Sequence, residues 1–221
     1  MPDTPAPPSA DDSATPRLSI IVPVLNEAMQ AYAQLRLLAP LRRCGVEVIA
    51  VDGGSTDDTL AVARRHAGRA ITVPGPAARQ FNVAAAFTSA EVLLLAGAGI
   101  VLPAFADQLI DQAMQDDACE WGRIDLRISG TPWRRLLASL PDAITGRHAE
   151  REAAAPLFVS RKAFMAVGGI PADAFPPLAA LANRLREAGF KATRVRKPAR
   201  IRRTAQASPP MLQWLGKHIR E

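Results

Sequence analysis

A short apolar segment that ends in an aspartate constrains the fold more than any other part of this sequence. Residues 48–51 (VIAV) run into Asp52, and Gly53, Gly54 and Ser55 follow directly. An uninterrupted apolar run of this length is typical of a parallel strand that is buried on both faces. In open α/β sheets, ligands bind at the carboxyl ends of such strands. The segment therefore predicts a parallel sheet that delivers the Asp52 carboxylate to its ligand-binding edge.

A second apolar run also ends in polar residues. Residues 18–22 lead through Pro23 to Asn26 and Glu27. Because parallel strands end at the same edge of a sheet, we expect the two strand ends to form a small-molecule site. Burying an acid without a partner costs free energy, so the position of Asp52 favours a binding role over a purely structural one.

Strand-like and helix-like segments alternate through the first half of the chain. Strands are expected at 18–22, 46–51, 70–73 and 92–96, and helices at 27–44, 56–67 and 77–88. Gly45 is expected to cap the first helix, and Ser55 with Asp58 to form a capping box at the second. This alternation is typical of an α/β fold with a mostly parallel central sheet, flanked by helices and joined by right-handed crossovers.

The second half of the sequence is less regular. Expected elements are helices at 104–115, 133–140, 161–167 and 178–188, strands at 121–128, 157–160 and 192–195, and a loop at 145–155. One domain is expected over residues 18–205. Residues 1–17 are rich in Pro, Ala, Ser and Asp, which is typical of a disordered tail. Residues 206–221 are expected to form an amphipathic helix or a tail.

Composition and charge narrow the class of partner. The net charge is +6, and basic residues gather between Arg184 and Arg203. Aromatic residues make up only 5% of the chain and no nucleic-acid-binding motif is present, so nucleic acid is not expected as a partner. The basic segment predicts a solvated face, with a protein partner or peripheral membrane contact as alternatives.

Targeting signals and cysteine usage bear on the compartment. The sequence has no signal-peptide pattern, and no apolar stretch reaches the about 20 residues that a membrane-spanning helix needs. Cys44 and Cys119 lack metal-ligand spacing and are expected to be free thiols. These features predict a cytoplasmic protein, with association at the inner membrane face as the alternative.

Five motifs occur in an order that is typical of one enzyme family. They are SIIVPVLNE at 19–27, DGGSTDDT at 52–59, RQFNVA at 79–84, WGRIDL at 121–126 and F-x-x-V-G-G at 164–169. Together they resemble family 2 glycosyltransferases, in particular a small stand-alone bacterial subgroup. The resemblance implies a GT-A fold, in which a Rossmann-like sheet binds a nucleotide-sugar at its carboxyl edge.

The resemblance also implies roles for single residues. Asp52 would accept a hydrogen bond from the nucleobase, and a fixed carboxylate suits the imide N–H of uracil, so UDP or a UDP-sugar is the expected ligand. Arg79 would reach the diphosphate, and Asn82 would support its loop. Asp57 and Asp58 have a simpler interpretation, because acids in a first turn stabilise a helix. The implied nucleotide-binding residues are Pro23, Asn26, Glu27, Asp52, Ser55, Arg79 and Asn82.

The metal-binding part of the implied active site is missing. The family neutralises the leaving diphosphate with Mg²⁺ or Mn²⁺, which is held by an acid in a turn after the fourth strand. Here that turn contains Gly97 and Gly99, at the positions where the subgroup has histidine and the metal-ligand aspartate. Glycine has no side chain to bind a metal, so no metal ion is expected at this turn.

The general base has no clear counterpart either. The family's acidic pair falls on Pro177 and Leu178, and its G-D-Q motif falls on the three alanines at 153–155. The best substitute is Asp125, on a strand expected to run under the acceptor pocket. Weaker candidates are His148, Glu150 and Glu152 in a loop, and Asp107, Asp111, Asp116 and Asp117 on or after a helix expected to pack away from the site. The catalytic residues therefore stay unassigned.

Three functions remain open. The first is a glycosyltransferase-derived protein that has lost ordinary metal-dependent catalysis, and that either still binds a nucleotide or nucleotide-sugar or acts as a partner or regulatory subunit. The second is an active, metal-independent transferase that uses Asp125 or the basic cluster, since arginine can neutralise a diphosphate. That cluster consists of Arg200, Arg202 and Arg203. The third is a dinucleotide-dependent enzyme, suggested by the glycines at 97 and 99, although Leu102 and Pro103 do not fit its motif.

Overall fold

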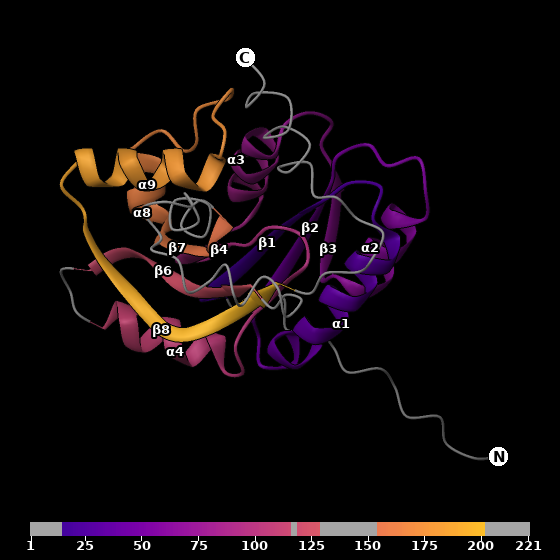
Figure 1. Cartoon of the computed structure of the whole chain (residues 1–221), viewed down its shortest axis with the longest axis horizontal. Coiled ribbons are helices and arrows are strands. Elements are labelled where there is room, and N and C mark those ends of the chain that lie inside the picture. Colours follow the sequence, from indigo (N-terminus) through magenta and orange to yellow (C-terminus); the bar gives the residue numbers. More distant parts are fainter. Residues whose placement is uncertain (1–14, 116–118, 129–153, 202–221) are drawn as a thin grey trace, which may run out of the picture.

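Helices and strands alternate along the chain, as the apolar pattern predicts. The computed structural model describes residues 15–115, 119–128 and 154–201 (Figure 1). In chain order the elements are β1 (Leu18–Val24), α1 (Ala28–Arg43), β2 (Glu47–Asp52), α2 (Thr59–His66), β3 (Arg69–Thr72), α3 (Ala77–Phe87), β4 (Val92–Leu95), β5 (Ile100–Val101), α4 (Ala106–Met114), β6 (Cys119–Ile128), β7 (Leu157–Ser160), α8 (Arg161–Ala166), α9 (Pro177–Glu187) and β8 (Lys191–Ile201). The α/β fold class expected from the sequence is therefore confirmed.

The strands of the described residues form one sheet in the order β3-β2-β1-β4-β7-β6-β8-β5. β1 is parallel to β2 and β4, and β2 is parallel to β3, whereas β7 is antiparallel to both β4 and β6. Two antiparallel steps restore the direction, so β6 runs the same way as β4, and β8 is parallel to β6. The strands β1, β2, β4, β6 and β8 therefore end at the same edge of the sheet, which we call the carboxyl edge.

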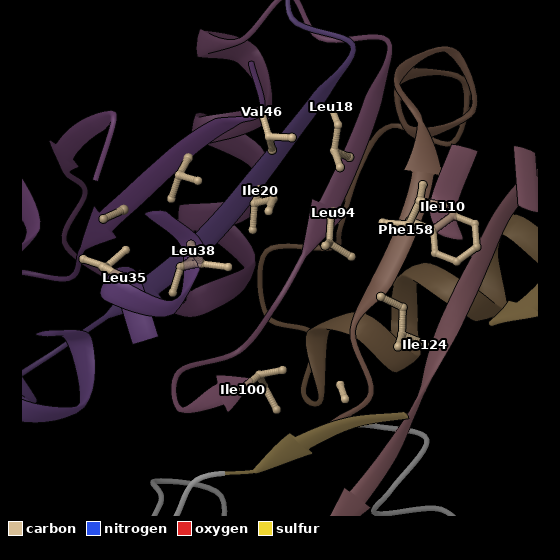
Figure 2. Packing of buried hydrophobic residues seen from close by; sticks show 14 of the residues in the cluster. Leu18, Ile20, Leu35, Leu38, Val46, Leu94, Ile100, Ile110, Ile124 and Phe158 are labelled. Atoms are coloured by element: carbon tan, nitrogen blue, oxygen red, sulfur yellow. The ribbon is translucent and has the colours of Figure 1, made fainter. Parts of the chain in front are cut away.

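Helices cover both faces of the sheet. On one face, α1 and α4 pack against the strands through Leu35, Leu38 and Ile110, and Figure 2 shows these side chains beside Ile20 and Leu94 of β1 and β4. On the other face, α3, α8 and α9 supply a second apolar core, with the side chains Phe81, Phe164 and Leu181. β1 and β4 are buried on both faces, which accounts for their continuous apolar sequences.

The expected capping box at the second helix is wrong. α2 begins at Thr59 rather than near Thr56, and Asp58 at its N-cap makes no side-chain capping bond. The Ser55 hydroxyl instead accepts a hydrogen bond from the backbone N–H of Asn26. A long-range contact to the neighbouring loop therefore takes the place of the local cap.

Two strands near the carboxyl edge differ from the sequence expectation. β5 forms directly after Gly99, and β8 is much longer than the expected strand at 192–195. The pairing of β8 with β6 contains an irregularity opposite residues 124–126, and Pro198 lies in the corresponding part of β8. A proline within a strand-like segment argues against a strand unless a bulge accommodates it. Local sequence rules therefore predict an end of this strand that is too early.

Several expectations lie outside the described residues. They are the tail at 1–14, the helix at 133–140, the loop at 145–153, the segment 206–221 and the residues Asp116, Asp117, His148, Glu150, Glu152, Arg202 and Arg203. In the part of the chain that the structure describes, no helix combines the length and apolar character required to cross a membrane. Peripheral membrane contact through the basic C-terminal segment stays a prediction.

Candidate functional site

Two loops at the carboxyl edge are tied to each other by hydrogen bonds. They follow β1 and β2, which lie side by side with Pro23 opposite Val51. The backbone N–H of Asn26 donates to Ser55 Oγ over 3.0 Å, and the N–H of Thr56 donates to Asn26 Oδ1 over 2.8 Å. Asn26 adopts a left-handed backbone conformation with φ 49°, which asparagine tolerates better than most residues. The polar residues expected at the two strand ends thus form one connected loop pair.

Asp52 lies at the centre of this loop pair and is only 1% exposed. Its Oδ2 accepts hydrogen bonds from the backbone N–H groups of Gly54 at 3.0 Å and Ser55 at 3.1 Å. Within the described residues, no group donates to the other carboxylate oxygen, Oδ1. A buried acceptor without a donor is costly in a folded protein. The arrangement therefore fixes the carboxylate through one oxygen and leaves the other without a donor among the described residues.

Asp57 serves the two helices that begin at the loops. Its Oδ1 accepts from the backbone N–H of Thr59 at 3.0 Å, and its Oδ2 accepts from the N–H of Ala28 at 3.3 Å. The Thr59 hydroxyl also donates to Asp57, and this bond is the main reason that the pKa of the Asp57 carboxyl is lowered. This geometry agrees with the interpretation of Asp57 as a helix-start residue.

Glu27 is the ionisable group of the loop pair with the largest change in acidity. Its backbone N–H donates to Thr59 Oγ1, and its side chain accepts from the N–H of Leu25. Burial of the carboxyl, with a smaller contribution from the charge of Asp57, raises its pKa from 4.5 to about 7, although the Leu25 hydrogen bond opposes the shift. At neutral pH a large fraction of Glu27 is therefore protonated and can donate a hydrogen bond.

Substitution of Glu27 by glutamine is expected to change how stability depends on pH. The folded state raises this pKa, so the stability linked to Glu27 is fully present below pH 4.5 and is lost as the pH rises through about 7. The variant should match the wild type near pH 4 and exceed its unfolding free energy by about 2–3 kcal/mol at pH 8. Urea unfolding of both proteins at the two pH values measures this, with the exposed Glu187→Gln as matched control. An equal difference at both pH values would contradict the prediction.

Arg79 and Asn82 lie on α3 but differ in their surroundings. The Arg79 side chain is exposed beside Gly75 in the turn that precedes the helix. Asn82 is engaged inside the fold, because its Nδ2 donates to the Ile170 carbonyl at 2.7 Å and its Oδ1 accepts from the Ile170 N–H at 2.9 Å. Asn82 thus fastens α3 to the turn after α8, whereas Arg79 is accessible to a ligand.

Gln80 was not singled out by the sequence but contacts the Asp52 loop. Its buried amide donates to the Gly75 carbonyl at 2.9 Å. A Cβ atom added to Gly53 would lie 2.7 Å from the Gln80 Nε2 atom, so this side chain is in close contact with the glycine after Asp52. The sequence signal that could have identified Gln80 is its position, as a polar residue, on the face of the helix that is expected to be buried.

The turn after β4 is closed by a side chain from α1. Gln34, which is 3% exposed, donates from Nε2 to the Gly97 carbonyl at 3.1 Å and accepts the Gly99 N–H at 2.8 Å. Gly99 has φ +71°, a conformation that favours glycine. Among the described residues, no group of three His, Cys, Asp or Glu side chains is placed to hold a metal ion. This turn therefore does not fit a divalent cation, which requires several hard oxygen ligands.

The expected positions of the general base carry no acid in the fold either. Leu178 is 4% exposed, and its carbonyl accepts a hydrogen bond from Arg123 Nη2 at 3.2 Å. Asp125 lies on β6 and forms an ion pair with Arg194 at 3.5 Å. Asp111 on α4 pairs with Arg17 at 3.0 Å, on the face of the sheet away from α9.

The described structure lacks the helix that a dinucleotide-binding site requires directly after the glycines at 97 and 99. The glycines at 97 and 99 are followed by β5, and the next helix, α4, begins only at Ala106. A dinucleotide fingerprint needs a helix that opens directly after the glycine turn, because that helix N-terminus holds the pyrophosphate.

A parallel sheet with polar loops at the carboxyl ends of its first two strands defines an α/β domain of the kind that binds ligands at that edge. The sequence matches the model of glycosyl transferase family 2 over residues 19–153, which is more than half of the chain. The chain belongs to this family, and the family resemblance of its motifs is confirmed. A comparison with curated protein sequences gave no match.

Solved glycosyltransferase structures share the fold. Glucosyl-3-phosphoglycerate synthase from Mycobacterium tuberculosis, in complex with Mn²⁺, UDP and glucosyl-3-phosphoglycerate, aligns with a TM-score of 0.64 and 20% identity, over 93% of this chain and 76% of that one. The mannosyltransferase PcManGT from Pyrobaculum calidifontis, in complex with GDP-Man and Mn²⁺, aligns with a TM-score of 0.64 and 19% identity, over 96% of this chain and 66% of that one. These similarities confirm the GT-A fold.

Proposed function

We propose that this protein binds a nucleoside diphosphate or nucleoside diphosphate-sugar at the loop pair after β1 and β2, and that it has lost ordinary metal-dependent sugar transfer. The buried Asp52 Oδ1, which lacks a donor among the described residues, is the observation that carries the proposal. Uracil and guanine both present a ring N–H that a fixed carboxylate can accept, and such a charge-assisted bond is stronger than a neutral one.

The residues around Asp52 fit the other parts of a nucleotide. Pro23 is partly buried at the end of β1 and Asn26 and Ser55 are held by the loop hydrogen bonds, so they are ready to shape a base and ribose pocket. The protonated fraction of Glu27 supplies a donor for a ribose or base oxygen. Arg79 is exposed near the same loops and is proposed to reach the diphosphate. Asn82 has the indirect role of holding α3 in place.

The chemistry of the site supports the proposed loss of metal-dependent transfer. Sugar transfer places negative charge on the departing diphosphate, and the solved relatives described above contain Mn²⁺. In this chain, Gln34 fills the hydrogen-bonding positions of the turn at Gly97 and Gly99, and Leu178 occupies the expected position of a base. A protein of this kind is suited to bind the nucleotide and to act as a partner or regulatory subunit.

Metal-independent transfer is the second candidate function. The observation in its favour is that Asp125 lies on β6 on the sheet face beside α9, paired with Arg194. A carboxylate on that face can act as a base if the ion pair opens when an acceptor binds. The two functions differ in turnover and share the same nucleotide site.

Nucleotide titrations with and without metal test the proposal. We expect UDP or GDP to bind with the same affinity in EDTA and in Mn²⁺, because the described residues offer no metal site. Isothermal titration calorimetry measures the affinity, and ADP is the control for base recognition. Failure of UDP and GDP to bind in both conditions would overturn the proposal. Hydrolysis of UDP-glucose or GDP-mannose, followed by chromatography, then separates the transferase from the non-catalytic protein.

A further inference from the structure

Two arginines lie directly opposite each other on neighbouring strands at the carboxyl edge. The register of β6 and β8 pairs Arg127 with Arg200, and both side chains are exposed. Because β6 and β8 run in the same direction as β1 and β4, both arginines lie near the strand ends at the edge that carries Asp52.

Both arginines lie on the face of the sheet that α9 covers elsewhere. Side chains alternate along a strand, and Trp121 belongs to the core on the α9 side, so Arg127 shares its face. Leu126 and its partner on β8, Ala199, belong to the core on the opposite side. Arg200, which follows Ala199, therefore lies on the same face as Arg127.

The charges of these two arginines are not compensated by the described residues. The acid closest in sequence, Asp125, is paired with Arg194. No ion pair within the described ranges involves Arg127 or Arg200. Like charges directly opposite each other destabilise a sheet. A pair of guanidinium groups in this position is favourable when an anion lies between them, and phosphate accepts the parallel N–H groups of arginine particularly well.

The pair is within reach of the expected diphosphate position. Asp52 and the turn after β4 are two strand spacings apart, about 10 Å. Arg200 pairs with Val101 on β5, which begins immediately after Gly99. Gly99 and Val101 are at most about 7 Å apart along the chain, and Arg200 lies about 5 Å from Val101 across the strand pair, so the Cα atoms of Arg200 and Gly99 are at most about 13 Å apart. A nucleotide with its base at Asp52 would extend towards this turn, and the strand pairing places Arg200 on the far side of β5 from the turn, with Arg127 beside Arg200.

We propose that Arg127 and Arg200 bind the diphosphate of the nucleotide in place of a divalent cation. The proposal rests on the nucleotide-binding function argued above and assigns to it the charge neutralisation that the turn at Gly97 and Gly99 lacks. The phosphate groups that this pair binds can belong either to the donor diphosphate or to a phosphorylated acceptor. The observations favour the donor, because β5 joins the pair to the turn after β4.

The test compares nucleosides with nucleoside diphosphates in EDTA by calorimetry. We expect Arg127→Gln and Arg200→Gln each to weaken UDP or GDP binding about tenfold, and the double variant to bind the diphosphate little better than the nucleoside. Binding of uridine or guanosine should not change. Arg64→Gln, an exposed arginine on α2 with the same change in charge, is the matched control and should bind all ligands like the wild type.

Three other outcomes overturn the proposal or separate it from the proposed function. If the double variant keeps the wild-type ratio of diphosphate to nucleoside affinity, the pair does not bind the donor. If, in addition, inorganic phosphate binds the UDP-saturated wild type but not the double variant, the pair belongs to an acceptor site. If the wild type binds no nucleotide, the proposed function fails, and pyrophosphate alone then tests the pair. Loss of pyrophosphate binding in the double variant supports phosphate recognition, and equal or absent binding in both proteins overturns it.

Discussion

Substitution of Asp52 by asparagine is expected to lower the affinity for UDP about 10- to 100-fold. The backbone N–H groups of Gly54 and Ser55 hold one carboxylate oxygen, so the asparagine carbonyl takes that place and its NH₂ group replaces Oδ1. A donor then faces the ring N–H of uracil, and the favourable contact becomes unfavourable. Cytosine carries an acceptor at the corresponding ring position, so CDP binding should improve relative to UDP. Calorimetric titration of both proteins with UDP and CDP measures the change.

Asp58→Asn is the matched control for this experiment. Asp58 is an exposed acid on the same loop, and the variant carries the same change in charge. It should bind UDP like the wild type, apart from a small effect of net charge that salt removes. Unchanged UDP affinity in Asp52→Asn would show that the carboxylate serves only the loop, and the proposed nucleobase contact would be wrong.

Gly122→Ala is expected to destabilise the fold by about 3 kcal/mol, because the added methyl group has no space. A Cβ atom at this position would lie 2.4 Å from Phe158 Cζ and 2.5 Å from the backbone carbonyl oxygen of Thr193. Phe158 is fully buried on β7, and Thr193 belongs to β8, so neither neighbour can move without disturbing the sheet. The melting temperature should fall by roughly 10 °C. Calorimetric unfolding measures both quantities.

Two further variants test whether this cost comes from crowding. Gly97→Ala introduces the same methyl group where the nearest atom, Ile100 Cγ1, would be 4.0 Å away, and it should change stability by less than about 1 kcal/mol. The double variant Gly122→Ala, Phe158→Leu should be less destabilised than the sum of its single changes, because the smaller side chain makes room. A fully additive double variant would indicate that the phenylalanine is not the cause.

Much of the fold and part of the site were predictable from local patterns. The apolar runs of β1, β2 and β4 predicted the parallel sheet because strands buried on both faces need apolar side chains at every position. The polar residues after β1 and β2 predicted the connected loop pair. The predicted capping box was wrong because the Ser55 hydroxyl bonds to Asn26, and such a contact between loops leaves no local pattern.

Other parts of the site depend on contacts between distant segments. Gln34 lies on a helix whose face is otherwise apolar, and the sequence did not show that its amide would close the turn at Gly97 and Gly99. The basic strand β8 was too polar, and interrupted by Pro198, to be predicted at its full length. Pairing with β6 stabilises this strand, and which strands pair depends on the whole sheet rather than on the local sequence.

Residue identities alone specify the family, the parallel half of the sheet, the carboxylate of Asp52 at its edge and the lack of acids at Gly99 and Pro177. These properties follow from residue identity and from short periodic patterns. The three-dimensional fold was needed to show that Asp52 keeps one oxygen without a donor among the described residues, and that Arg127 and Arg200 lie side by side at the same edge. Strand order, direction and register fix such neighbours, and they arise from long-range pairing that no local segment encodes.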